Sequence, residues 1–119
     1  MADYSPLYMP GTVISVTASA AVTGGQVLEV SGNDTVGPAG AASVKVVGVA
    51  AFDAAANSRV AMHGRGQVHR TPASGAITAG ARVAPAANGR VASIADGTAA
   101  IGVAMTTAAD GAPVVWMEL

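Results

Sequence analysis

The two histidines of this chain, His63 and His69, come nearest to forming a metal site. They flank Gly64-Arg65-Gly66, so a tight hairpin at that tip would bring them together across two strands. Zinc usually takes three or four protein ligands, and no acidic residue stands beside this pair. Arg65 and Arg70 would also repel a cation. We therefore expect no metal site and interpret both histidines as partly exposed strand residues.

The carboxylates show no pairing that acid and base catalysis would use. They are scattered singly, mostly beside turn residues: Asp3, Glu29, Asp34, Asp53, Asp96, Asp110 and Glu118. No Gly-x-Ser-x-Gly elbow occurs, and the only lysine, Lys45, has no P-loop around it. In Gly64-Arg65-Gly66 a dinucleotide fingerprint begins, but His69 stands where its third glycine belongs. We expect no catalytic residue, no cofactor and no small-molecule substrate, and predict that the chain is not an enzyme.

Composition narrows the class of partner. With 119 residues the chain is expected to form one domain, and six Lys plus Arg against seven Asp plus Glu give a net charge of -1. So few basic residues predict no nucleic-acid binding. The chain has no cysteine, which excludes disulfides and thiolate metal sites. The remaining class is a protein that works through its surface.

The apolar residues are mostly small. Of the 51% hydrophobic residues, 28 are Ala and 17 are Val, so the apolar area per residue is low and association with partners is expected. The longest apolar stretch, 46–52, is far shorter than the ~20 residues of a membrane span. The first residues lack the basic and apolar blocks of a signal peptide. We expect a soluble chain made in the cytoplasm and no membrane contact.

Stretches rich in β-branched residues alternate with turn residues along residues 12–119, which predicts an all-β fold. The expected strands are 12–17, 26–31, 45–50, 59–63, 67–71, 82–84, 90–93, 100–105 and 113–118. Tight turns are predicted at Asn33-Asp34, Gly64-Arg65-Gly66, Asn88-Gly89 and Asp96-Gly97. The Ala-rich pieces 53–56 and 107–110 are predicted to be loops, with room for about one helical turn.

Residues 1–11 form a separate feature, an expected extended N-terminal arm. Its two prolines exclude a helix or a central strand, and it holds half of the aromatic residues. An arm this apolar should dock on something. The candidate binding residues are Tyr4, Pro6, Leu7, Tyr8, Met9 and Pro10. The alternative is that Tyr4, Leu7 and Tyr8 fold back onto their own domain.

An internal repeat organises the rest of the chain. Residues 18–25 (ASAAVTGG) are echoed by 73–80 (ASGAITAG), and Gly48-Val49-Ala50 is echoed by Gly102-Val103-Ala104. We predict a single β-rich domain, 12–119, built from two tandem related β-units of about 12–70 and 71–119. The two copies would close around a shared core as a small barrel or sandwich. Chance similarity in an Ala- and Gly-rich chain is the alternative.

Trp116, the only tryptophan, lies in the last predicted strand. We expect it in the core, although a role as an interface anchor stays open.

The order of these motifs resembles the phage capsid cement family. The resemblance rests on Pro6-Leu7-Tyr8-Met9-Pro10-Gly11-Thr12-Val13-Ile14, on residues 20–27 (AAVTGGQV), on 47–54 (VGVAAFDA), on 73–80 and on Ile101-Gly102-Val103-Ala104. It therefore spans almost the whole chain.

The resemblance implies a capsid decoration protein on the outer surface of an expanded head. Its partner would be the major capsid protein, and such proteins commonly form homotrimers at three-fold positions. The arm would be the clamp, adding extended backbone to a neighbouring capsid element. The alternative is another phage structural module, such as a tail or fibre component. Localisation would be the virion, after assembly in the host cytoplasm.

Overall fold

The computed structural model describes residues 4–5, 7–8, 11–95 and 99–119, and all the regular structure in them is β-strand apart from one short 3-10 turn, η1 (Ala87–Gly89). The strands are β1 (Ile14–Ala18), β2 (Val27–Gly32), β3 (Thr35–Pro38), β4 (Val46–Ala50), β5 (Arg59–His63), β6 (Val68–Pro72), β7 (Arg82–Ala86), β8 (Arg90–Ser93), β9 (Gly102–Ala104) and β10 (Pro113–Glu118). These residues contain no helix that could cross a membrane. The predicted all-β class is confirmed.

Strands β1–β5 form the first unit, a closed barrel in the order β1-β3-β2-β4-β5. Antiparallel pairing of β1 with β5 joins Ile14 to Met62 and Val16 to Val60. Parallel pairing of β1 with β3 at Thr17 and Thr35 closes the ring. Closure leaves this unit without a free sheet edge along those pairs.

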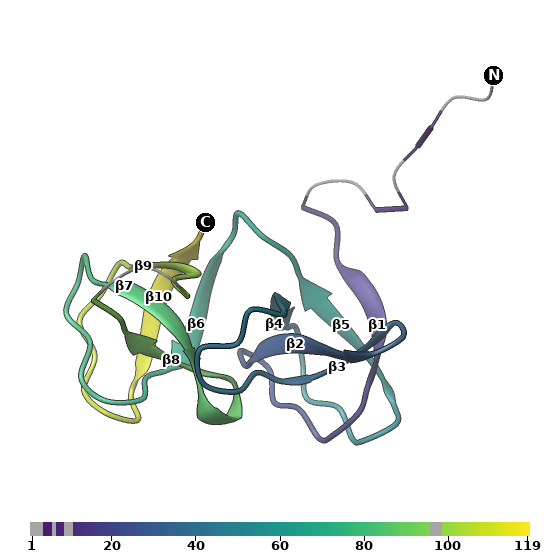
Figure 1. Cartoon of the computed structure of the whole chain (residues 1–119), viewed down its shortest axis with the longest axis horizontal. Coiled ribbons are helices and arrows are strands. Elements are labelled where there is room, and N and C mark those ends of the chain that lie inside the picture. The colour runs from purple at the N-terminus through teal and green to yellow at the C-terminus, as the bar shows by residue number, and fades with distance from the viewer. Residues whose placement is uncertain (1–3, 6, 9–10, 96–98) are drawn as a thin grey trace.

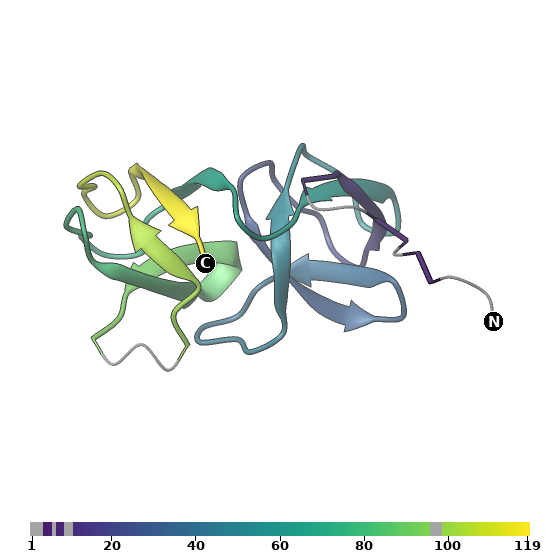
Figure 2. The ribbon, with the colours of Figure 1, turned by 90° about the horizontal axis from the view of Figure 1, so that it is seen from above.

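Strands β6–β10 form the second unit, a sheet in the order β6-β10-β9-β7-β8. The two units lie side by side along the long axis of the molecule (Figures 1 and 2). No strand pairing joins β6 to β8 in the described residues, and an isolated parallel bridge links Ala73, just after β6, to Val91 of β8. The second unit is therefore the same barrel with an opening between β6 and β8.

Hydrogen bonds repeat from one unit to the other at a separation of 54 or 55 residues, which confirms the predicted duplication. In the first unit, the N–H of Val22 donates to the carbonyl of Ala54, and in the second the N–H of Ile77 donates to the carbonyl of Ala108. The parallel bridge between Ala18 and Val36 is matched by the one between Ala73 and Val91. Because the paired atoms correspond as well as the residue types, chance similarity does not explain the repeat.

Two apolar clusters form the core. One lies wholly inside the first barrel: Val16, Ala18, Val22, Leu28, Val36, Ala50, Val60 and Met62. The other fills the second unit around the fully buried Trp116, and it also includes Val27, Ala39 and Val49 from the outer side of the first barrel. The shared core predicted from the sequence thus exists only where the first unit packs against the second.

Differences from the predicted elements are local. Strand β3 was not predicted, because Gly37 and Pro38 interrupt its two β-branched residues. The hairpin predicted at Gly64-Arg65-Gly66 is wrong, since β5 and β6 pair in different sheets. All of β6 belongs to the second unit, so the passage between units lies at 64–67 rather than at 70–71.

The predicted turn residues behave as expected where they are described. Asn88 and Gly89 both have positive φ, 62° and 70°, as a type I′ turn requires, and Asn33 and Asp34 join β2 to β3. Residues 53–56 and 107–110 are loops that each contribute one isolated bridge. The turn predicted at Asp96-Gly97 lies outside the described residues.

Candidate functional site

The described arm residues are exposed and belong to no strand or helix. Tyr4 is 89% exposed, Leu7 95% and Tyr8 43%. Large apolar side chains rarely stay in water without a partner when they are grouped, so these three mark a candidate contact surface. The alternative in which all three fold back against their own domain is not what this structure shows for Tyr4 and Leu7. Candidates Pro6, Met9 and Pro10 lie outside the described residues.

An apolar hollow of about 390 Å³ lies at the root of the arm. Leu7 and Tyr8 contribute to its wall, and the first barrel supplies the rest. Its main lining residues are Ile14, Val16, Val30, Val36, Val47 and Met62. A concave aliphatic surface of this size can accept side chains of a partner.

Polar groups stand at the edge of this region. Asp34 lines the hollow, and it also lines a neighbouring depression of about 190 Å³ together with Arg59. The Arg59 guanidinium donates to the Thr17 hydroxyl at 3.2 Å and to the Ser15 carbonyl at 3.3 Å, which holds its charge beside the depression. An apolar centre with a polar rim is the usual anatomy of a protein interface.

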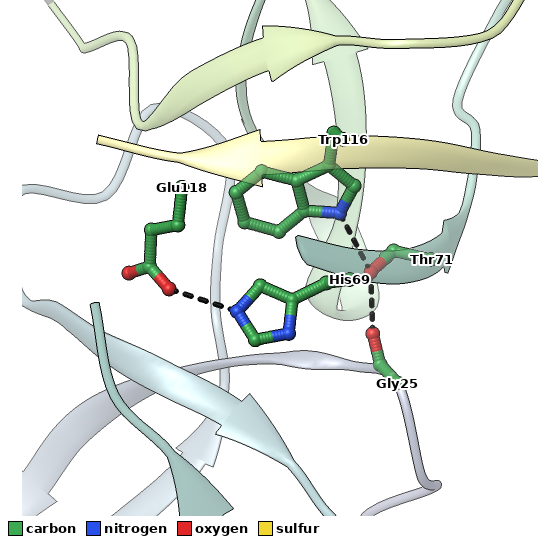
Figure 3. A network of polar contacts seen from close by, with 5 residues as sticks. All are labelled: Gly25, His69, Thr71, Trp116 and Glu118. Carbon is green, nitrogen blue, oxygen red and sulfur yellow. Dashed lines mark hydrogen bonds and ion pairs between the residues drawn. The ribbon is translucent and has the colours of Figure 1, made fainter. Parts of the chain in front are cut away.

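A buried polar network lies at the other candidate site, in the second unit (Figure 3). The indole N–H of Trp116 donates to the Thr71 hydroxyl at 3.0 Å, and that hydroxyl donates to the Gly25 carbonyl at 2.6 Å. His69 Nε2 lies 3.0 Å from Glu118 Oε1. All of the side chains in this network are buried, and the link to Gly25 joins the second unit to the first.

Trp116 and His69 can be compared with what the sequence predicted. Trp116 is fully buried, which confirms its expected core position. His69 is only 7% exposed, so its interpretation as a partly exposed residue is wrong. It occupies the strand position equivalent to Ile14 of the first unit, and Glu118 supplies the polar partner that a buried histidine requires.

The histidine pair does not assemble a metal site in the part of the chain described. The rings of His63 and His69 lie 6.4 Å apart, although their strands belong to different sheets. No group of three or more His, Cys, Asp or Glu residues with metal-binding geometry occurs among the described residues. The His69–Glu118 contact acts within the fold.

Most of the described carboxylates have structural partners. Asp53 Oδ1 accepts from the Gly24 N–H and Asp110 Oδ1 from the Gly75 N–H, both at 2.8 Å. Glu29 accepts from the Ser43 hydroxyl at 2.6 Å and from the Gly40 N–H at 3.1 Å. Turn and loop roles were predicted for most of these carboxylates, and Asp53 and Asp110 have them.

The hollow could not be found from the sequence. Its walls come from β1, β2, β3, β4 and β5, and residues such as Val30 and Val47 have no special spacing along the chain. Only the closure of the barrel brings them together. Proximity to the apolar arm was the one available signal, since the hollow lies where the arm joins β1.

Comparisons with known proteins cover most of the chain. A family model described as phage cement protein matches residues 8–119. The fold is similar to that in the crystal structure of the head fiber gp8.5 N base of bacteriophage phi29, with a TM-score of 0.74 and 18% sequence identity, covering 91% of this chain and 93% of that one. No curated protein matches the sequence.

Proposed function

This chain belongs to the phage cement protein family, and from that premise we propose that it decorates the outer surface of a tailed-phage head. It binds the major capsid protein there and bridges neighbouring capsomers. The family match over residues 8–119 is the observation that carries this proposal. The exposed apolar arm and the hollow at its root supply the surface that such binding needs.

The arm is the proposed clamp. Leu7 and Tyr4 expose nearly all of their side chains in this chain alone, so burying them against a partner removes apolar area from water. Extended backbone with unpaired N–H and carbonyl groups can also add to the edge of a neighbouring sheet. Burial of apolar side chains and strand addition together favour a partner that offers an unpaired sheet edge and apolar pockets.

The proposed mechanism is mechanical rather than catalytic. Packaged DNA pushes the shell outward, and a subunit that holds two capsomers resists their separation. Each contact needs only modest strength, because many copies act together on one lattice. No chemical step, cofactor or small-molecule substrate enters this role, so the chain is proposed to be non-enzymatic.

We further propose that the working form is a homotrimer in the virion, assembled onto heads in the host cytoplasm. A trimer would present three arms at a three-fold position of the head, where three capsid subunits offer equivalent sites. The small apolar area per residue also favours a form in which copies support one another.

Co-sedimentation with expanded, undecorated heads tests the proposal. The full chain should pellet with heads to a saturable level, and decorated heads should retain DNA at higher temperature than bare heads. Deletion of residues 2–11 should reduce binding strongly while leaving the melting temperature of the free protein nearly unchanged. Failure of the full chain to pellet with heads would refute the function, whereas undiminished binding of the deletion variant would refute only the arm as clamp.

A fibre component is the second candidate, favoured by the fold likeness to the phi29 head fiber base. A fibre base would bind heads without raising the temperature at which they release DNA. The same heat-release assay therefore separates the two roles.

A further inference from the structure

The two units are related copies in tandem. The side of the first unit beside β1 and β3 can therefore be compared directly with the side of the second unit beside β6 and β8. Register pairs align them: Ile14 with Met62 in the first unit corresponds to His69 with Trp116 in the second. In the same way Val30 with Val36 corresponds to Pro85 with Val91. A surface that is filled in one unit thus shows what the same surface can hold in the other.

The first unit fills this surface in the second. We name the inserted part the wedge and define it as Gly25, Gln26, Val27, Ala39, Ala42 and Val49. Its valines and Ala39 join the core around Trp116 and Val91. The wedge lies beside β6, where Gly25 meets Thr71, and beside η1, where Ala39 meets Gly89.

Hydrogen bonds to backbone carbonyls hold the wedge in place. The Gly25 carbonyl accepts from the Thr71 hydroxyl, and the Ala39 carbonyl accepts from the Gly89 N–H at 2.9 Å. Gln26 Nε2 donates to the Asn88 carbonyl at 2.8 Å. The wedge therefore presents aliphatic side chains and backbone polar groups together, from the start of β2, from the loop after β3 and from β4.

The equivalent surface of the first unit is the hollow. Its residues Val16, Val30, Val36, Val47 and Met62 correspond to Thr71, Pro85, Val91, Ile101 and Trp116, all of which contact the wedge or belong to the core that it completes. Where the second unit has the large Trp116, the first has the smaller Met62. The hollow is therefore the surface of the first unit that corresponds to the wedge-binding surface of the second unit.

Resting on the proposed function, we propose that the hollow is a socket for a capsid-protein β-segment with the chemistry of the wedge: a turn of small residues carrying one or two aliphatic side chains. The arm residues Leu7 and Tyr8 line the same hollow, so the inserted segment would lie under the clamp. Arm and socket then form one continuous binding surface.

A second copy of this chain fits the socket less well. The matching part of the second unit carries Arg82 where the wedge has Val27, and burying a guanidinium among aliphatic side chains is costly. Among the described arm residues, Leu7 does not fill the socket either, because it stays 95% exposed while lining it. These observations favour a different protein as the occupant.

Substitution of Val30 with arginine tests the socket. Val30 is 40% exposed at the rim, so Val30→Arg should fold normally and place a charge in the hollow. The matched control is Val68→Arg, at a strand position that is 50% exposed and outside the hollow. We expect affinity for expanded heads to fall by at least about tenfold for Val30→Arg, as for a buried interface residue, and to stay within about twofold for the control.

A second variant covers a folding defect in the first. Met62→Trp introduces the residue that the second unit has at the equivalent position, Trp116, and so fills the hollow from inside. We expect this variant to bind heads more weakly than the wild-type chain does. If the wild type and both variants bound heads with equal affinity, the socket proposal would be refuted and the proposed function would stand. Absence of wild-type binding would remove both.

Cross-linking identifies the occupant. Because the chain has no cysteine, Val30→Cys can be labelled at a single site with a photoactivatable maleimide. On decorated heads the label should form its cross-links with the capsid protein, with Val68→Cys as the control. Cross-links to another copy of this chain instead would show that a second copy occupies the socket and would overturn the proposal.

Discussion

Thr71 joins the two units through one hydroxyl, and its replacement by valine is the most informative perturbation of the fold. The side chain is fully buried, accepts from the Trp116 indole and donates to the Gly25 carbonyl. Valine keeps the shape and removes both hydrogen bonds. The first unit already has valine at the equivalent position, Val16, where the barrel interior is apolar.

The magnitude follows from the groups left without partners. A buried donor or acceptor that loses its hydrogen bond costs about 1–3 kcal/mol, and Thr71→Val creates one of each. The added methyl group returns about 0.8 kcal/mol. We expect a net loss of about 2–4 kcal/mol in the free energy of unfolding, a large part of the ~5–15 kcal/mol that a domain has. The melting temperature should fall by roughly 10 °C.

Urea denaturation followed by far-UV circular dichroism, which does not depend on the single tryptophan, measures the loss directly, with exposed Thr23→Val as the control. In a Trp116→Phe background the indole N–H is absent, so Thr71→Val should cost about 1–3 kcal/mol less. A loss below about 0.5 kcal/mol in the wild-type background, or no difference between the two backgrounds, would refute the network as a stabilising link.

Two further substitutions test the packing between and within the units. Gly89→Ala should cost about 1–3 kcal/mol more than Gly66→Ala: both glycines have positive φ, but a Cβ on Gly89 would lie 2.8 Å from the Val27 carbonyl whereas one on Gly66 meets nothing within 4 Å. Equal melting temperatures for these two variants would contradict the tight contact. Glu118→Ala should cost about 1–3 kcal/mol by removing the partner of buried His69, and Glu118→Gln, which keeps an acceptor, should cost less in the same denaturation assay.

Much of the fold is readable from the sequence because its signals are local. Strands such as Arg59–His63 and Pro113–Glu118 have the bounds expected from β-branched residues between turn residues. The repeat also survives as residue types, since Gly25 and Gly80 have φ of 90° and 88° at equivalent turns. Glycine is needed there because side chains rarely adopt that conformation.

What the sequence could not reveal depends on contacts between distant segments. The predicted hairpin between His63 and His69 was wrong because β5 and β6 pair with strands of different sheets. A Gly-Arg-Gly sequence is equally compatible with a connection between two units. In strand Thr35–Pro38 only the first two residues favour a strand, and its neighbours β1 and β2 hold it in place. The hollow exists only because Val30, Val47 and Met62 meet in the closed barrel.

Cryo-electron microscopy of expanded heads incubated with this protein tests the central claim most directly. The account predicts density for the chain on the outer surface of the head, with the arm and the hollow of the first barrel against the capsid protein and a capsid segment inside that hollow. Heads without added density, or density attached through the second unit with the arm facing solvent, would contradict it.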